Sequence, residues 1–326
     1  MSDWQLKTPV AFLIFNRPET TRRVFEEIAR VRPPRLFIVA DGPRAERPGE
    51  AERCAQTRSI VERVDWPCEV VTNYSEVNLG CKARVSSGLD WLFAQVDEAV
   101  ILEDDCLPHP TFFRFCEELL ERYRHDERVG MISGDNFQFG RRADDCSYYF
   151  SKYTHIWGWA TWRRAWKHYD VSAKLWPQFL SSGDFKRVTM PMERSYWRAA
   201  YGAVNAGTLD TWDYQWTLTC WVHSMLAVMP EVNLVSNIGF GPGATHTVRA
   251  SKLANIGTAE ITWPLREPSI VAANLVADQR TAKIHFSAGY LRMLAIRLFS
   301  YLRNCIDKMR MPAGRTKSPA QSRRSS

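Results

Sequence analysis

The first hundred residues predict an α/β fold in which helices flank a mainly parallel sheet. Short runs rich in β-branched residues alternate there with segments whose apolar residues recur at helical spacing. Such alternation is typical of the strand–helix–strand units that build a parallel sheet. From about residue 141 the sequence becomes rich in tryptophan and shows fewer clear strands. No Gly-, Ser- or Pro-rich linker separates the halves, so we expect one domain over residues 1–286, with halves at about 1–140 and 141–286.

The individual elements follow from these patterns. Four strands are expected at residues 9–16, 35–41, 68–73 and 99–105. The segments between them have the spacing and length of crossover helices, at residues 19–29, 48–64 and 82–95. A further helix is expected at 110–123 and a fifth strand at 129–133.

Composition and charge exclude several classes of protein. An apolar content of 45% with 12% aromatic residues excludes disorder throughout the chain. No run of about 18 uncharged apolar residues occurs, so no membrane-spanning helix is expected. The net charge of +7 is unevenly placed: residues 287–326 alone carry +8, and the first 286 residues carry 34 basic and 35 acidic side chains. A nearly neutral body whose tryptophans lack interleaved Lys and Arg argues against a nucleic-acid-binding protein.

The C-terminal segment is expected to be an amphipathic basic helix at residues 287–311, followed by a disordered tail at 312–326. Apolar residues recur at helical spacing over 291–309, with Arg and Lys beside them. This pattern fits a helix lying in the interface of an anionic membrane, and equally a helix docked on the body of the protein. Eight scattered cysteines without a CxxC pair, together with a polar start, indicate reduced thiols. We therefore expect a cytoplasmic protein, peripheral on the inner face of the membrane if the helix binds lipid.

Carboxylates follow the fourth predicted strand, and other polar residues follow the first two. Asn16 and Arg17 come after the first, Asp41 after the second, and Glu103-Asp104-Asp105 after the fourth. Ligands of open α/β sheets bind at this carboxyl edge. If the strand continues through the triplet, Glu103 and Asp105 project one way and Asp104 the other. Three adjacent carboxylates repel one another and suit Mg²⁺ or Mn²⁺, which take oxygen ligands completed by phosphate. The alternative is a solvated acidic turn or a helix cap.

Three further features of the second half carry alternatives. Asp213 lies between Trp212 and Trp216, where partial desolvation makes a carboxylate a better general base near neutral pH; the alternative is that Asp210 and Asp213 only cap a helix. The tryptophans Trp157, Trp159 and Trp162 suit either a sugar-stacking platform or the core. A Gly-rich segment at 239–244, interrupted by Pro242, is expected to be a loop that closes over a ligand rather than a dinucleotide fingerprint.

In order and spacing, these pieces resemble nucleotide-sugar glycosyltransferases of the GT-A fold. The similarity is greatest to the family of the Golgi N-acetylglucosaminyltransferase that starts hybrid and complex N-glycans, and to related bacterial glycosyltransferases. It covers roughly residues 8–250. It rests on Phe15-Asn16-Arg17, Ala40-Asp41-Gly42, Leu102-Glu103-Asp104-Asp105 with Pro110–Phe113, Trp157-Gly158-Trp159, Trp212-Asp213 and the loop from Ile238 to His246.

The resemblance implies a role for each matching residue. Asp105 holds Mn²⁺ or Mg²⁺ that bridges the diphosphate, and Asp213 deprotonates the acceptor hydroxyl. The donor nucleotide-sugar is bound by residues of the first half: Asn16, Arg17, Asp41 at the uracil edge, Lys82, Arg84, Glu103 from the second shell, and Asp104 at ribose or sugar hydroxyls. His246 is either a second metal ligand or a diphosphate contact, and Trp157, Trp159 and Trp212 form the acceptor platform. Arg84 stands where the family has a nucleobase-side histidine, which weakens the implied uridine specificity.

The sequence thus predicts an inverting, metal-dependent glycosyltransferase that moves a sugar from a nucleoside diphosphate, UDP above all, to a glycan or lipid-linked saccharide. A sugar-phosphate nucleotidyltransferase shares the sheet but needs a Gly-rich loop after the first strand, where this chain has Asn16-Arg17-Pro18. A non-catalytic nucleotide-sugar-binding module is the second alternative. Binding of a nucleoside diphosphate without turnover on any acceptor would favour the binding module.

Overall fold

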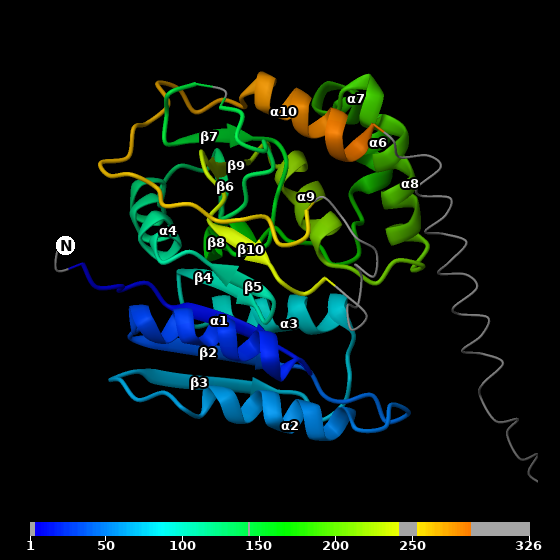
Figure 1. Cartoon of the computed structure of the whole chain (residues 1–326). Helices are drawn as coiled ribbons and strands as arrows, with labels where there is room; N and C mark the ends of the chain where they lie inside the picture. The colour runs from blue at the N-terminus through cyan, green and yellow to red at the C-terminus, as the bar shows by residue number, and fades with distance from the viewer. Residues whose placement is uncertain (1–3, 143, 241–252, 288–326) are drawn as a thin grey trace, which may run out of the picture.

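The computed structural model describes residues 4–142, 144–240 and 253–287. Its centre is an eight-stranded mixed sheet in the order β3-β2-β1-β4-β8-β6-β9-β7 (Figure 1). Six of these strands run in one direction, because β8 and β7 alone pair antiparallel with their neighbours. The predicted α/β class with a mainly parallel sheet is confirmed. The strands are β1 Val10–Ile14, β2 Arg35–Ala40, β3 Glu69–Tyr74, β4 Glu98–Glu103, β6 Val129–Ser133, β7 Tyr148–Ser151, β8 Trp159–Trp162 and β9 Leu226–Pro230.

Helices cover both faces of the sheet. One face carries the apolar sides of α1, α2 and α4, and the other carries α3, α5 and α9. Strands β1, β2 and β4 are buried along nearly their whole length, as parallel strands between two helical layers must be. These helices are α1 Pro18–Val31, α2 Glu50–Val61, α3 Cys81–Phe93, α4 Thr111–Arg122, α5 Arg163–Trp166 and α9 Asp213–Val222.

Most elements of the first half lie within two residues of their predicted bounds, and two differences affect the site. The fourth strand ends at Glu103, so Asp104 and Asp105 form a turn instead of continuing the strand. A two-stranded sheet follows at once, in which β5 (Cys106–Pro108) pairs antiparallel with β10 (Val235–Asn237). This pairing brings the chain near residue 238 against the end of β4, although the two segments are more than a hundred residues apart.

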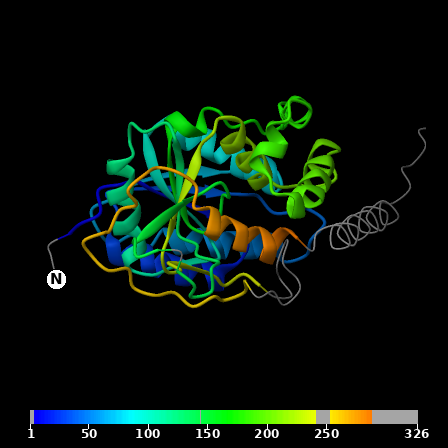
Figure 2. The ribbon, with the colours of Figure 1, turned by 90° about the horizontal axis from the view of Figure 1, so that it is seen from above.

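Strands of both predicted halves alternate within the single sheet. Strand β8, from the tryptophan-rich half, lies between β4 and β6 of the first half. A third cluster of apolar side chains joins α9 to the short helices α6 (Trp176–Ser181) and α7 (Asp184–Val188) and to α8 (Arg194–Asn205). Seen from above, these helices (green in Figure 2) lie together on the side of the molecule away from the N-terminus.

The chain ends its described part in α10 (Leu275–Thr281), continued by a π-helical turn at Ala282–Phe286. Among the described residues, no helix is both long and apolar enough to cross a bilayer. The seven cysteines within the described ranges carry free thiols. The predicted amphipathic helix at 287–311 and tail at 312–326 lie outside the described residues from residue 288 onward, and so does His246.

Candidate functional site

The polar residues predicted from the sequence gather at the carboxyl edge of the parallel strands. Strands β1, β2 and β4 pair directly, so their ends bring Arg17, Asp41 and the residues after Leu102 to one edge of the sheet. The loop from β1 to α1 is short, because Pro18 starts the helix at once with its fixed backbone angle. The edge therefore places an Arg and several carboxylates on rigid elements.

Asp104 and Asp105 both face Arg17. An Arg17 Nη1 donates to Asp105 Oδ2 at 2.5 Å and lies 3.7 Å from Asp104 Oδ1. The backbone N–H of Phe15 donates to the other Asp104 oxygen at 2.9 Å, which fixes that carboxylate beneath β1. The expected alternation, with Asp104 opposite Asp105, is wrong because the strand ends two residues earlier and the turn brings both side chains to Arg17.

Glu103, the last residue of the strand, has a different environment. Its Oε1 atom is buried and has no hydrogen-bond partner among the described residues. Burial first, then the negative charges of Asp105 and Asp104, raise the pKa of Glu103 to about 8. Burial and Asp105 likewise raise the pKa of Asp104 to about 7. Within the described residues, three carboxyl groups thus lie near the guanidinium of Arg17, and the negative forms of Glu103 and Asp104 are disfavoured as long as no further cation is near.

Asp213 reaches this cluster from the other half of the chain. It is the first residue of α9, and the Thr211 hydroxyl donates to its Oδ1 atom. Its charge contributes to the raised pKa of Glu103, so the two carboxylates are close enough to interact electrostatically. Asp213 is half-buried, as a base that must meet a substrate hydroxyl has to be.

Asp210 does not cap its own helix, contrary to one sequence-based alternative. Its two carboxylate oxygens accept the backbone N–H groups of Cys81 and Lys82, each at 3.2 Å, at the start of α3. Gly80, just before, has φ +82°, and a Cβ there would lie 2.8 Å from Asp210 Oδ2. Asp210 therefore fastens the loop before α3 to the segment that carries Asp213, a role that the sequence analysis missed because the partners lie 129 residues apart.

The remaining donor-side residues are held by the loops around them. Both Asp41 oxygens accept bonds from the loop before α3, including the N–H groups of Leu79 and Gly80 at 2.9 and 3.2 Å. Arg84 is buried, with Nε and Nη2 donating to Ala40 O and Asn73 O. In this structure both order the carboxyl edge; direct donor contact stays a prediction for them.

Asn16 and Lys82 lie at the rim of the same edge. The Asn16 side-chain amide donates to Glu50 Oε1 at 2.9 Å, which ties the β1–α1 loop to the start of α2. Glu50 is buried and also accepts three bonds from Arg44. Lys82 belongs to the first turn of α3 and is half-buried. For both residues, the predicted contact with a donor is neither supported nor opposed by these bonds.

Two of the three predicted platform tryptophans are core residues. Trp159 is 1% exposed and Trp212 is 2% exposed, and their rings stack at 5.5 Å inside the cluster beneath α9. Neither can present its face to a sugar, so the platform prediction is wrong for them and the core alternative holds. Trp157 is half-buried at the carboxyl edge and meets Phe240 edge to face at 5.7 Å. It alone of the three can contact a ligand.

The segment after β10 packs on the carboxylate turn. Ile238 N–H donates to Asp105 O at 2.8 Å, and a Cβ on Gly239 would lie 2.0 Å from Asp105 Oδ2. Only glycine therefore permits this approach. The loop predicted to close over a ligand begins here, and its continuation at 241–252 lies outside the described residues.

A hard divalent cation fits this donor set. The ligands available are carboxylate oxygens, and within the described part of the chain Glu103 Oε1 has no partner while Asp104 and Asp105 share Arg17. Within the described ranges, no group of three or more His, Cys, Asp or Glu side chains is placed to hold a metal ion. The arrangement suits an ion bound by one or two carboxylates and completed by phosphate oxygens and water, as Mg²⁺ commonly is.

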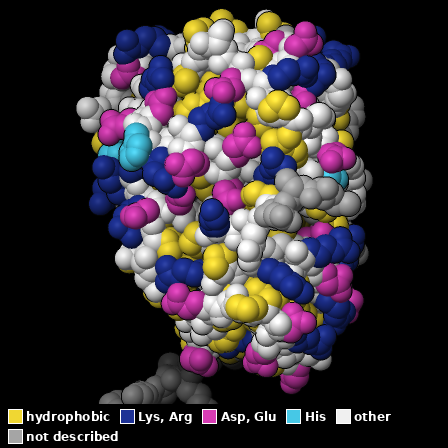
Figure 3. All heavy atoms as spheres, turned by 90° about the vertical axis from the view of Figure 1, so that its left-hand side faces the viewer, with side chains coloured by type: hydrophobic (Ala, Val, Ile, Leu, Met, Phe, Trp, Pro, Cys, Tyr) yellow, Lys and Arg dark blue, Asp and Glu magenta, His cyan; other side chains and the backbone are white. Residues whose placement is uncertain are grey.

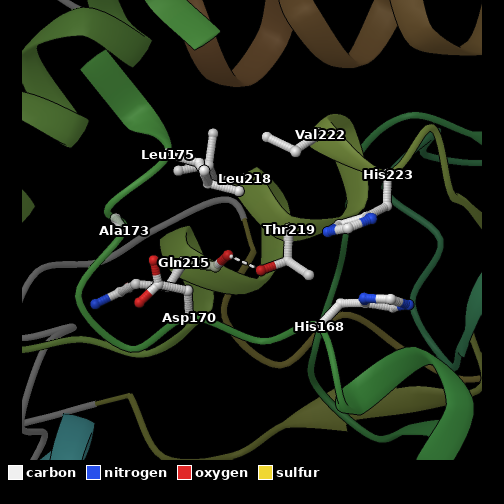
Figure 4. A pocket seen from close by; sticks show the side chains of 9 residues that line it. All are labelled: His168, Asp170, Ala173, Leu175, Gln215, Leu218, Thr219, Val222 and His223. Atoms are coloured by element: carbon white, nitrogen blue, oxygen red, sulfur yellow. Dashed lines mark hydrogen bonds between the residues drawn. The ribbon is translucent and has the colours of Figure 1, made fainter. Parts of the chain in front are cut away.

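Two hollows lie away from this cluster. One, beside α9, has a volume of about 10 Å³, room for a single water molecule; His168 and His223 stack across its rim at 4.1 Å (Figure 4). The other is an open groove of about 820 Å³ where the parallel strands begin, on the side seen in Figure 3, where cationic and anionic side chains are intermixed. Three of its arginines are paired with carboxylates, as in Arg124 with Glu98 and Arg163 with Asp97. The first hollow is too small for a sugar nucleotide, and three arginines of the groove are already engaged by carboxylates.

Comparisons with known proteins give little beyond partial likeness of fold. No family model and no curated protein matches the sequence. The mannosyltransferase PcManGT from Pyrobaculum calidifontis, solved with GDP-Man and Mn²⁺, is 15% identical over 50% of this chain, with a TM-score of 0.34. This chain spans 46% of that protein, about half its length.

Two other solved structures give similar figures. HddC from Yersinia pseudotuberculosis is 9% identical over 48% of this chain and 77% of its own, with a TM-score of 0.30. A UDP-glucose pyrophosphorylase, solved with UDP-glucose, is 11% identical over 45% of this chain and 64% of its own, with a TM-score of 0.25. At these scores the likenesses carry no inference about activity, so the site itself must supply the argument.

Proposed function

We propose that this protein is an inverting, metal-dependent glycosyltransferase that moves a sugar from a nucleoside diphosphate to a hydroxyl of a glycan or lipid-linked saccharide. One observation carries the proposal: three carboxyl groups gather at the end of β4, and Asp213, a separate carboxylate on α9, lies within electrostatic reach of them. A diphosphate donor with its cation complements the carboxyl groups at the end of β4, and an acceptor hydroxyl complements Asp213. UDP is the proposed nucleotide, and the cytoplasmic face of a membrane, reached through residues 287–311, is the proposed location.

On the donor side, the roles follow from charge and position. Asp105 is the proposed ligand for Mn²⁺ or Mg²⁺, with His246 either a second ligand or a diphosphate contact. A bound ion would neutralise charge on the departing diphosphate. Arg17, which now lies on Asp105, would turn part of its guanidinium to the phosphate oxygens. Asp104, fixed by the Phe15 N–H, would accept ribose or sugar hydroxyls.

On the acceptor side, Asp213 is the proposed general base. It takes the proton of the acceptor hydroxyl as that oxygen forms a bond to the anomeric carbon. The bond between that carbon and the diphosphate oxygen breaks in the same step, so the nucleoside diphosphate leaves and the configuration inverts. Glu103, whose charge interacts with those of Asp105 and Asp213, would orient metal-bound water or the donor sugar from the second shell. Trp157, which is half-buried, offers the remaining accessible aromatic surface for the acceptor.

Product analysis distinguishes this function from its alternatives. The full chain is incubated with a panel of nucleotide sugars, Mn²⁺ and saccharide acceptors. Transfer with release of nucleoside diphosphate, and an inverted anomeric signal in NMR, is expected. Formation of nucleotide sugar from a sugar phosphate with release of pyrophosphate would instead identify a nucleotidyltransferase. Donor binding without turnover on any acceptor would identify a binding module.

Substitution of Asp213 tests the proposed base. The Asp213→Asn variant should bind donor with unchanged affinity and lose about 10³-fold in kcat, because general-base catalysis typically contributes 10²–10⁴-fold. Asp184→Asn is the matched control, since Asp184 is also the first residue of a helix, α7, and lies outside the cluster. Turnover of Asp213→Asn within tenfold of the wild type would remove Asp213 from the mechanism.

Substitution of Asp105 tests the metal. Mn²⁺ together with a nucleoside diphosphate should raise the Tm of the wild-type protein, because a ligand bound by the folded state stabilises it. The Asp105→Ala variant should lose this Mn²⁺-dependent part of the shift. A variant that keeps the full shift, and keeps Mn²⁺-stimulated turnover, would contradict the proposed role.

A further inference from the structure

The outer face of α10 is apolar and exposed although the helix is firmly attached to the body. Leu275 is 72% exposed, Val276 52% and Ile284, in the turn that continues the helix, 45%. Ile270 just before the helix is 68% exposed, and Phe139, from a neighbouring loop, 45%. Five of the eleven most exposed large apolar side chains in the described part of the chain thus belong to this one surface, here called the α10 face.

Internal contacts show that the helix cannot turn these side chains inward. Its inner face buries Ala277, Asp278, Thr281 and Ala282. Asp278 accepts a hydrogen bond from the Ser151 hydroxyl at 2.6 Å and one from the Lys152 N–H at 3.3 Å. The buried Gln138 amide donates to Ala277 O at 3.3 Å and to Thr281 Oγ1 at 2.9 Å. Rotation would break all four bonds, so the orientation of the α10 face is fixed.

Cationic side chains lie among the apolar ones. Arg280 and Lys283 share the outer face of the helix, and Lys283 makes no ion pair within the described residues. Arg280 donates to the backbone carbonyl of Arg142, which brings the exposed Arg141 beside the helix, while the Arg142 side chain is paired with Glu231. The nearby Asp144 is engaged by the side chain of Asn274, the N-cap of α10. Exposed apolar residues with Arg and Lys between them are characteristic of helices that lie in the interface of anionic membranes.

The position of α10 agrees with this character. It lies at the β7 end of the sheet, the end opposite β3 and α2 (Figure 1). The chain that follows it, residues 287–326, carries a net charge of +8. A surface that holds the protein on anionic lipid through α10 therefore has a strongly cationic sequence directly attached to it.

We propose that the α10 face is a membrane-contact surface whose partner is an anionic lipid bilayer. Leu275, Val276 and Ile284 enter the headgroup boundary, and Arg280 and Lys283 meet lipid phosphates. This inference does not depend on the enzymatic activity, because it concerns a surface at another place in the fold. Membrane binding and sugar transfer can be measured separately, so either can fail without the other.

Vesicle partitioning of the full chain tests the proposal. The wild type should bind vesicles of phosphatidylglycerol and phosphatidylethanolamine more tightly than pure phosphatidylcholine vesicles. A triple variant with Leu275→Glu, Val276→Glu and Ile284→Glu should partition at least about tenfold more weakly, since three apolar side chains no longer enter the boundary. The matched control replaces three other half-exposed apolar residues, Val70, Val171 and Met192, with Glu and should partition like the wild type.

Ionic strength and oligomeric state complete the test. In about 0.5 M salt, where contacts between exposed charges are screened, the difference between the triple variant and the wild type should persist. Equal partitioning of the two proteins, or no binding of the wild type to either kind of vesicle, would overturn the proposal. A wild type that is dimeric without vesicles and a triple variant that is monomeric would also overturn it, because the α10 face would then be a contact between copies of this chain.

Discussion

Two carboxylate sites in this protein differ in how completely their carboxylates are paired and hydrogen-bonded. Glu193, in the aromatic cluster around α8, is completely buried, and each of its two carboxylate oxygens accepts two hydrogen bonds. Its Oε1 accepts Lys152 Nζ at 2.6 Å and Met190 N–H at 2.7 Å; its Oε2 accepts Tyr153 OH at 2.6 Å and Trp197 Nε1 at 2.8 Å. At the end of β4, in contrast, three carboxylates share one arginine, and Glu103 Oε1 has no partner within the described residues.

The difference separates a structural charge from one kept for a ligand. A buried charge is costly unless it is paired and hydrogen-bonded, and Glu193 meets that condition within its own fold. The carboxyl groups at the end of β4 are not fully paired and hydrogen-bonded. The cost of ionising them there appears in the raised pKa values of Glu103 and Asp104. Sites that must bind a cation or substrate commonly retain such strain at the expense of stability. This contrast supports a ligand site at the carboxyl edge on grounds independent of any resemblance.

The largest effect that tests this contrast is expected at Glu193. Glu193→Gln should lower the free energy of unfolding by about 3 kcal/mol or more, because it leaves the Lys152 ammonium without its counter-charge. Urea denaturation followed by tryptophan fluorescence measures it. Under conditions where the variant is folded, donor binding should be unchanged, since Glu193 is held by Tyr153 and Trp197 of the third apolar cluster and not by residues of the carboxyl edge.

The control for this measurement is an exposed ion pair. Glu69→Gln removes the partner of Arg35 on the edge strand β3, where the Glu69 side chain is 59% exposed. Its cost should be under about 1 kcal/mol, as for most surface pairs. If the two variants lose similar stability, Glu193 does not have the structural role that the comparison assigns to it.

The first half of the fold could be predicted because its signals are local. Buried parallel strands appear in the sequence as short β-branched runs, and crossover helices as periodic segments between them. Residues that follow such strands, among them Arg17 and Asp105, can be assigned to one edge without any knowledge of side-chain contacts. The position of the carboxylate cluster could therefore be predicted from the sequence.

What could not be predicted depends on contacts between distant segments. Strand β8 was hidden in the cluster from Trp157 to Trp162, because pairing with β4 and β6 is decided by neighbours that its own pattern does not reveal. The same is true of Trp159 and Trp212: aromatic spacing alone does not distinguish a buried stack from an exposed platform. The turn at Asp104 could only be given as an alternative, because an acidic strand end and an acidic turn have the same sequence pattern.

A smaller effect is expected at Asp210, which joins the two halves. Asp210→Ala should lower the free energy of unfolding by about 1 kcal/mol, the usual cost of losing acceptors at the start of a helix. The loop before α3 also holds Asp41, so donor affinity should fall with stability. Thermal unfolding and a nucleotide-binding titration measure both. A loss of stability with unchanged affinity would show that this attachment does not position the donor side.

The smallest effect has the opposite sign and tests the contrast most directly. Glu103→Gln removes one of three mutually repelling carboxylates, and we expect it to raise the free energy of unfolding by up to about 1 kcal/mol while it weakens Mn²⁺-dependent donor binding. The matched control is Glu98→Gln, at the other end of β4, where the carboxylate is paired with Arg124 and its loss should be slightly destabilising. Urea unfolding of the two variants decides the matter, because they differ only in which end of one strand loses its charge. If Glu103→Gln is as destabilising as Glu98→Gln, the Glu103 carboxylate is held by stabilising contacts like those of Glu193. The carboxyl groups at the end of β4 would then need no bound ligand to compensate them.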